Sequence, residues 1–250
     1  MQCTELLQYL NRLLNVETFH DYAPNGLQVE GRKEVKRILL GVTASQALVD
    51  EAVRWGADML LVHHGWFWKG ESTNIVGMKR KRLRALLCAD INLVAYHLPL
   101  DAHNTLGNNA QLAKLLGVKP LYQCGESDLV WVGEPEEGAI SGKAFVQRVE
   151  SVLKRTPMIL GELPEKITKL AWCTGAAQDW VQLAAQEGAQ VYLSGEASER
   201  TTHEAVENGI AYIGAGHHAT ERYGIQALGK HLKSVFSELE IRYLEIDNPI

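Results

Sequence analysis

Histidines and carboxylates follow apolar runs at three places in this sequence. His63 and His64 end the run that begins at Met59. His97 and Asp101 follow a second apolar run. Imidazole nitrogens and carboxylate oxygens together bind divalent ions such as iron, manganese and zinc. The residues therefore indicate a metal site. For the histidine pair taken alone, the alternative is two strand-capping histidines bonded to backbone groups.

The third place repeats the spacing of the second. His217 and Glu221 are four residues apart, as are His97 and Asp101. Residues at i and i+4 share a helix face, so His217 and Glu221 can act together near the start of a helix. The intervening Leu98-Pro99 predicts a non-helical segment, in which His97 and Asp101 need not face the same way. We therefore expect His97 in an outer position, where it holds a ligating carboxylate or moves a proton.

Three or four of these imidazoles with the two carboxylates would make a metal site of nitrogen and oxygen ligands. About five ligands exceed what one tetrahedral ion uses, which favours two ions that share Asp101 or Glu221. His103 and His218 belong to the same stretches, and we expect both at the surface or in packing beside the site. No cysteine lies in these stretches, which disfavours a structural zinc knot or an iron–sulfur cluster.

Short buried strands must position these residues. The run from Met59 to Val62 is too short for a helix and lies between glycines, so it predicts a strand. Neighbouring residues on a strand point to opposite faces, so His63 and His64 can serve one site only where the strand ends. In open α/β sheets, ligands bind at the carboxyl ends of strands.

The second half of the chain repeats the first. Residues 38–65 align without gaps to residues 170–197, with seven identical positions that include a shared Gly-Ala pair. Both copies continue with a helix and then a strand that leads into the histidine–acid spacing. The pattern predicts an α/β fold of two repeats, 1–118 and 119–250, of which 119–168 is a less regular opening segment. If the copies pack with these strand ends together, their polar residues converge.

Periodicity and turn residues predict the other elements. Helices are expected over 4–15, 46–55, 79–89, 108–116 and 143–154. Strands are expected over 27–29, 37–42, 92–96 and 210–213. Thr43 or Ser45 can cap the second helix. The aromatic run Trp66-Phe67-Trp68 could stack on a flat ligand, but it fits a subunit contact better because aromatic residues are enriched there.

The composition is that of an ordinary globular protein. Of the 250 residues, 46% are hydrophobic and 22% are charged, and the formal net charge is -5. The basic cluster over 79–84 is explained by a solvated helix face, and the negative net charge disfavours a nucleic-acid partner. The four cysteines are scattered, and no signal-peptide pattern or membrane-spanning run is present. These features predict a reduced, cytoplasmic protein without a membrane partner.

Five stretches resemble a known protein family: Asn25-Gly-Leu-Gln-Val29, Gly41-Val-Thr-Ala-Ser45, His63-His64-Gly65, His97-Leu-Pro-Leu-Asp101 and Gly216-His-His-Ala-Thr-Glu221. The chain is similar to the Nif-three-like family of dinuclear-metal-centre proteins, the GTP cyclohydrolase I type 2 homologs, and most of all to its bacterial YbgI-type branch. The resemblance implies two intertwined α/β repeats with mixed sheets and a metal site between them. It also implies a toroidal homohexamer whose sites face the central cavity. The two metal ions would be bound by the residues that match the family's ligands: His63, His64, Asp101, His217 and Glu221.

The residues and the resemblance together predict a metal-dependent hydrolase. Two cations would lower the pKa of a bridging water and polarise the substrate. For a GTP-like nucleotide the attack would fall on the imidazole-ring carbon of guanine, with loss of formate, and His97 or His103 could act as acid or base. No glycine-rich phosphate loop is visible, so Arg222 and lysines of neighbouring subunits are the candidate triphosphate contacts. The alternative is a non-catalytic metal-binding ring that stores or delivers ions or docks a partner.

Overall fold

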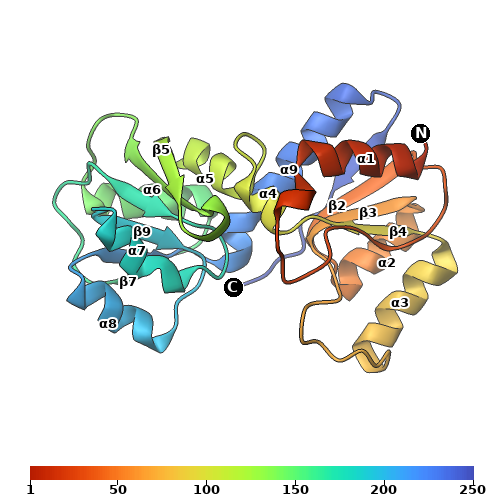
Figure 1. Cartoon of the computed structure of the whole chain (residues 1–250), viewed down its shortest axis with the longest axis horizontal. Helices are drawn as coiled ribbons and strands as arrows, with labels where there is room; N and C mark the ends of the chain where they lie inside the picture. Colours follow the sequence, from red (N-terminus) through yellow and green to blue (C-terminus); the bar gives the residue numbers. More distant parts are fainter. The chain divides into compact units, whose positions relative to one another are not determined.

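Two mixed sheets organise the chain, one in each of the two units into which its contacts divide it (Figure 1). The computed structural model describes all 250 residues. Unit 1 consists of residues 1–107 and 224–247, and unit 2 consists of residues 108–223 and 248–250. The chain therefore leaves unit 1 after residue 107 and returns to it at residue 224.

Helix α9 (His217–Val235) begins in unit 2 and continues into unit 1. The units divide the chain by packing, whereas the predicted boundaries, 1–118 and 119–250, divide it by sequence repeat. The two divisions differ at two segments: residues 224–247, which include most of α9, pack in unit 1, and residues 108–118 pack in unit 2. Short 3₁₀ helices lie at Val16–Thr18, Glu126–Asp128 and Gln178–Trp180.

A five-stranded sheet forms the centre of unit 1. In spatial order its strands are β1 (Gly26–Val29), β4 (Asn92–Ala95), β3 (Met59–His64), β2 (Arg37–Thr43) and β11 (Glu240–Tyr243). The strands from β4 to β11 run parallel, and β1 pairs antiparallel with β4. The strand that carries His63 and His64 is thus central, in agreement with its uninterrupted apolar run.

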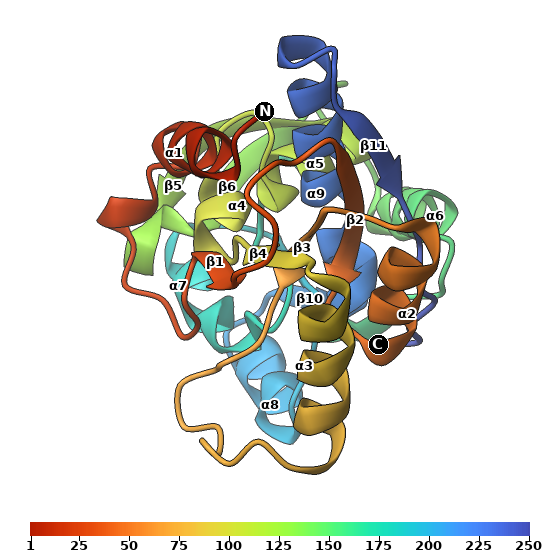
Figure 2. The same cartoon turned by 90° about the vertical axis from the view of Figure 1, so that its right-hand side faces the viewer.

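Helices cover both faces of this sheet (Figure 2). They are α1 (Cys3–Leu13), α2 (Gln46–Trp55), α3 (Gly77–Ala89), α4 (Leu98–Ala102) and the larger part of α9. Leu6 of α1 and Leu228 of α9 pack in one cluster with Leu40 of β2. Leu48 of α2 packs in the cluster of Leu39, on the opposite face. Consecutive strand residues point to opposite faces, so β2 supplies apolar side chains to both helical layers.

Helix α2 begins and ends where the sequence predicts. Of the two candidate caps, Ser45 is the one in place, because its Oγ accepts a hydrogen bond from the backbone N of Leu48 at 3.3 Å. Gly56 ends the helix with a φ of 67°. Glycine adopts this left-handed conformation without a Cβ clash, so the chain turns back towards the sheet.

The segment after β4 differs from the prediction. Residues 98–102, expected to be non-helical because of Leu98-Pro99, form the short helix α4. Proline is tolerated because it lies in the first turn, where its missing N–H has no helical acceptor and its φ suits the helix. The prediction was wrong because it treated this proline as part of a helix interior. Asp101 therefore lies on a helix that begins directly after His97.

A six-stranded sheet forms the centre of unit 2. In spatial order its strands are β5 (Val118–Cys124), β6 (Val130–Pro135), β8 (Leu170–Trp172), β9 (Val191–Ser194), β10 (Ala211–Gly214) and β7 (Met158–Leu160). β8, β9 and β10 are parallel, like β2, β3 and β4 in unit 1, so the repeated α/β pattern is confirmed. The sequence predicted one helix within 119–168 but missed the β5–β6 hairpin and the edge strand β7.

Helices cover both faces of the second sheet as well. They are α5 (Asn108–Leu116), α6 (Gly142–Leu153), α7 (Val181–Gln186) and α8 (Glu199–Glu207). Phe145 of α6 packs with Leu193 of β9 on one face, and Val181 of α7 packs with Tyr192 on the other. Both units are therefore sheets between helical layers, which is the mixed α/β class that the sequence predicts. None of the helices combines the length and the apolar character that crossing a membrane requires.

Candidate metal centre

Strand β3 delivers two imidazoles to the carboxyl edge of the sheet in unit 1. His63 is completely buried, and its Nδ1 lies 2.9 Å from the carbonyl oxygen of Tyr96. The Nδ1 of His64 lies 3.2 Å from Oγ1 of Thr43, at the end of β2. The strand ends here, and the two ring centres are only 4.4 Å apart. Each ring is thus fixed at its Nδ1, His64 by the last residue of β2 and His63 by the residue that follows β4.

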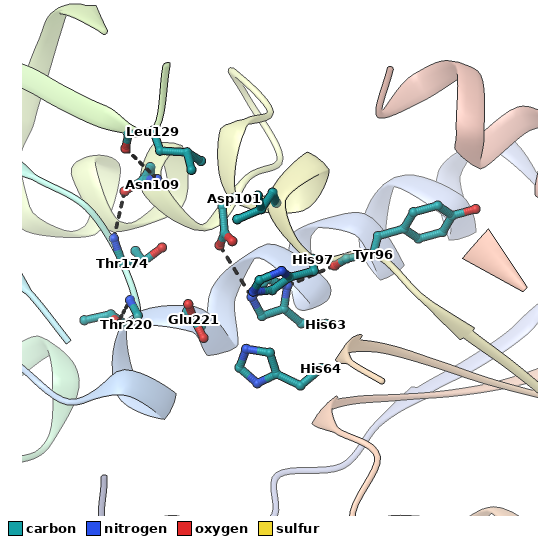
Figure 3. A network of polar contacts seen from close by, with 12 residues as sticks. His63, His64, Tyr96, His97, Asp101, Asn109, Leu129, Thr174, Thr220 and Glu221 are labelled. Carbon is teal, nitrogen blue, oxygen red and sulfur yellow. Dashed lines mark hydrogen bonds and ion pairs between the residues drawn. The ribbon is translucent and has the colours of Figure 1, made fainter. Parts of the chain in front are cut away.

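His97 brings a third imidazole to this edge (Figure 3). Its ring centre lies 5.3 Å from that of His63 and 5.7 Å from that of His64. One nitrogen from each of the three rings lies within 4.8 Å of the others. The Nδ1 of His97 is 2.7 Å from Oδ1 of Asp21. The expected outer histidine therefore does contact a carboxylate, but that carboxylate belongs to Asp21 and was not foreseen.

Asp101 faces His63 from α4 (Figure 3). Its Oδ1 is 3.5 Å from Nε2 of His63, and the residue is 5% exposed. Two ligand atoms bonded to one ion at about 2.1 Å stand about 3.0 Å apart at a right angle and about 3.4 Å apart at a tetrahedral angle. The spacing of this pair is therefore close to that of two ligands of one ion.

Helix α9 carries the corresponding pair in unit 2. The Nε2 of His217 is 2.9 Å from Oε2 of Glu221, whose side chain is 3% exposed. The Nδ1 of His217 lies 2.6 Å from Oε1 of Glu196, which follows β9. Burial alone would lower the pKa of His217, but its contacts with Glu221 and Glu196 raise it to about 9. Two carboxylates around one imidazole thus attract positive charge, which a divalent ion can supply in place of the proton.

Gly175 makes room for Glu221. It follows β8 with a φ of 70°, and a Cβ at this position would lie 2.0 Å from Oε1 of Glu221. The backbone N of Gly175 donates to Oγ1 of Thr220 at 3.1 Å. The backbone N of Thr174 donates to Oδ1 of Asn109, also at 3.1 Å (Figure 3). The loop after β8 is therefore held directly against the carboxylate, and only glycine fits there.

The sequence did not indicate three residues that hold these histidines and carboxylates in place or make room for them. Asp21 is 76 positions from His97 and Glu196 is 21 positions from His217, so no short spacing marks either contact. Glu196 aligns with His64 in the internal repeat, and that correspondence could have drawn attention to it. For Gly175, one glycine among 22 carries no local signal.

The two remaining candidate histidines take positions beside these pairs. The Nδ1 of His103 accepts hydrogen bonds from the backbone N of Leu106 at 3.1 Å and of Thr105 at 3.3 Å, which caps the turn after α4. Burial lowers the pKa of His103. His218 is buried, and its backbone N donates to the carbonyl oxygen of Ile250 at 2.9 Å. Both histidines thus take part in local packing, one of the two placements expected for them.

The aromatic run separates into an interior and an outer part. Trp66 is buried, its Nε1 donates to the carbonyl oxygen of Ala44 at 2.9 Å, and its backbone N donates to Oε1 of Gln28 at 2.7 Å. Trp68 is half-buried and meets the ring of His97 nearly at a right angle, with ring centres 4.9 Å apart. Trp66 is therefore part of the packing of unit 1, and Trp68 is the member of the run beside the imidazoles.

The donor chemistry of both pairs fits a divalent ion. Each pair combines an imidazole nitrogen with a carboxylate oxygen, a set that suits zinc, iron and manganese. Each histidine also has its Nδ1 against an oxygen atom, of Tyr96 for His63 and of Glu196 for His217. Metal-binding histidines are held in this way by an outer acceptor. Several groups of histidine, aspartate and glutamate in this chain could therefore hold a metal ion.

The chain matches one protein family over almost its whole length. The family described as Duf34/NIF3 (NGG1p interacting factor 3) matches residues 1–249. The chain belongs to the DUF34/NIF3 family. This confirms the resemblance found in the five short sequence stretches.

Other DUF34/NIF3 relatives match the chain over its full length. A protein of Haemophilus influenzae named GTP cyclohydrolase 1 type 2 homolog is 51% identical over 253 residues, which is 100% of both chains. A solved structure described as protein ybgI, of unknown function, is 50% identical, with a TM-score of 0.96 and 100% coverage of both chains. The structure of TTHA1606 from Thermus thermophilus is 31% identical, with a TM-score of 0.87, and covers 100% of this chain and 99% of that one. The mixed α/β fold is therefore that of the DUF34/NIF3 family.

Proposed function

We propose that this DUF34/NIF3 chain binds two divalent metal ions through His63, His64, Asp101, His217 and Glu221. One observation carries the proposal. In each unit, a histidine Nε2 faces a carboxylate oxygen where parallel strands end, at 3.5 Å in unit 1 and 2.9 Å in unit 2. We further propose that the histidine and carboxylate ligands of the two repeats converge on one metal site between the repeats.

The proposed ligand atoms indicate how many ions bind and of which type. Five ligands suit two ions better than one tetrahedral ion, and a shared carboxylate offsets the repulsion between two cations. Imidazole with carboxylate suits iron, manganese or zinc, so the ion that is available decides among them.

The reaction that such a site supports best is hydrolysis of a nucleotide-like small molecule. When bound, divalent ions lower the pKa of a water molecule and polarise the electrophilic atom of a substrate. The nucleotide is suggested by the name of the relatives, GTP cyclohydrolase 1 type 2 homolog. A cytoplasmic homohexameric ring, with the sites facing its cavity, is the proposed setting.

The chain's own residues would move the protons. His97 is the first candidate acid or base, because it lies at the edge of the sheet with His63 and His64. His103 is the second candidate, but its Nδ1 already accepts two backbone hydrogen bonds, so only Nε2 remains for this role. In the non-catalytic alternative, the same ligands hold ions for storage, delivery or partner docking.

One experiment separates these functions. Purified protein is analysed for metal content and screened against nucleotides and simple phosphoesters, with and without chelator. Turnover that chelator abolishes supports the hydrolase, whereas tight metal without turnover on any substrate supports the binding protein. Glu221→Gln is compared with Glu199→Gln, which changes an exposed glutamate on α8. Equal metal content in both variants, or fewer than two ions in the wild type after reconstitution, contradicts the proposed site.

A further inference from the structure

Asp21 lies in the loop before β1, and both of its carboxylate oxygens are bound. Its side chain is 3% exposed. Oδ1 accepts from the backbone N of Tyr22 at 2.6 Å and lies 2.7 Å from Nδ1 of His97. Oδ2 accepts from the backbone N of Leu98 at 2.9 Å and from Nδ2 of Asn25 at 2.8 Å. The proposed metal site gives this buried carboxylate no role.

The ring of His97 is held from several directions. The backbone N of His97 donates to Oδ1 of Asn25 at 2.7 Å. The ring of Trp68 stands against that of His97 at an interplanar angle of 84°. The rings of His63 and His64 lie within 6 Å, centre to centre. The ring of His97 cannot turn over without breaking the contact at its Nδ1.

We propose that Asp21 is a positioning residue that holds His97 in the tautomer with its proton on Nδ1. A carboxylate can only accept hydrogen bonds, so the Nδ1 that faces it has to be the donor. In a neutral imidazole the other nitrogen then carries a lone pair. His97 thus presents an unprotonated Nε2 to the imidazole cluster of unit 1. The use of this lone pair as a base depends on the proposed function, whereas the tautomer itself does not.

The hydrogen bonds that Asp21 accepts favour its ionised form. Burial alone would raise the pKa of Asp21, but its contacts with His97, Asn25 and Leu98 lower it to about 2. The second repeat shows the same arrangement, because Glu196 faces Nδ1 of His217 at 2.6 Å. In both repeats, the histidine that begins the His-x-x-x-acid spacing therefore has a carboxylate at Nδ1.

Nitrogen NMR of metal-free protein tests the proposal. Long-range ¹H–¹⁵N spectra of histidine-labelled protein distinguish protonated from unprotonated ring nitrogens. With the His97 signals assigned through His97→Gln, we expect Nδ1 protonated and Nε2 unprotonated at a pH where the ring is neutral. A wild-type spectrum with the proton on Nε2 overturns the proposal, whether or not any variant folds.

The variant Asp21→Asn gives a second measurement. Asparagine offers one oxygen and one NH₂ group. The two part-buried donors at the Oδ2 position, the backbone N of Leu98 and Nδ2 of Asn25, need the oxygen, whereas the exposed backbone N of Tyr22 at the Oδ1 position can bond to water instead. The NH₂ group then faces His97, whose Nδ1 has to accept, so the tautomer should switch to Nε2–H. The same change in the catalytic triad of serine proteases has this effect. A folded variant whose His97 keeps the wild-type tautomer would show that Asp21 does not set it.

The control is Glu199→Gln, which alters the partner of an exposed histidine. The carboxylate of Glu199 lies 3.2 Å from Nε2 of His203, and both side chains are mostly exposed. This variant should leave the His97 signals unchanged. Because all spectra are recorded without metal, failure to bind two ions leaves the tautomer result standing. A wrong tautomer refutes the inference even if two ions bind.

Discussion

Replacing Gly175 by alanine should push the carboxylate of Glu221 out of its position, although none of the proposed metal ligands is itself substituted. The added Cβ would lie 2.0 Å from Oε1 of Glu221, and real Cβ atoms essentially never approach closer than 3.0 Å. The carboxylate must therefore retreat by about 1 Å, as the van der Waals contact requires. Loss of an outer partner of a metal ligand costs about 10- to 100-fold in affinity, so displacement of a ligand should cost at least about 100-fold.

A matched control separates this effect from backbone strain. Gly188 has a φ of 75°, close to the 70° of Gly175, and nothing lies within 4 Å of a Cβ placed on it. Alanine at either position costs about 1 kcal/mol because of the left-handed backbone. Each variant should therefore lower the melting temperature by about 2–4 °C. Only Gly175→Ala should also lose metal.

Metal affinity is measured by calorimetric titration of metal-free protein with a divalent ion. The bound metal is then counted by elemental analysis after desalting. Adding Glu221→Asp to Gly175→Ala shortens the side chain by one methylene and should restore part of the affinity, because the carboxylate then clears the new Cβ. If Gly175→Ala binds metal as tightly as Gly188→Ala does, Glu221 is not a ligand at its observed position and the reasoning fails.

Three further results are expected. Asp101→Ala and Glu221→Ala should each lose both ions, whereas His63→Ala or His64→Ala should lose mainly one. The reason is that a bridging carboxylate offsets the repulsion between the two cations. Metal counts in the reverse order would contradict a bridging role. Light scattering at micromolar concentration should show a closed ring, and a stable monomer would rule out the assembly. Wild type should be more stable than Asp21→Asn by about 1–2 kcal/mol after allowance for solvent screening. Because the folded pKa of Asp21 is lowered to about 2, this difference should be complete above the unfolded pKa of 3.8 and vanish as the pH falls towards 2; denaturant unfolding at several pH values measures it.

Patterns within a short window predicted much of the fold. The apolar run before His63, the glycine after α2 and the matching Gly-Ala pair each act over a few residues, and all correspond to observed elements. The non-helical prediction for α4 failed because the position of Pro99 within the helix, rather than its presence, decides the outcome. The β5–β6 hairpin was missed because Val118–Cys124 is mostly exposed and lacks an alternating apolar pattern.

In the candidate site, the sequence predicted the possible ligands but not the residues that hold them in place. The histidines and acids stand out because they follow apolar runs and their spacing recurs. The side chains that orient them do not stand out, since Asp21 reaches His97 only through the folded chain. Gly175 matters only because Glu221 comes to lie against it. Contacts of this kind depend on tertiary packing, so a single sequence cannot reveal them.

Because α9 contributes residues to both units, cutting the chain within this helix would not yield two intact units. A fragment of residues 108–223 would keep only the first two turns of this helix, those that carry His217 and Glu221, and helices this short are unstable in water. The remainder, held by Gly229 against Leu40, belongs to the other unit. A gene fragment that encodes residues 108–223 should therefore not hold His217 and Glu221 on one stable helix face. Proteolytic nicking within α9 should likewise disturb the helical segment that carries His217 and Glu221.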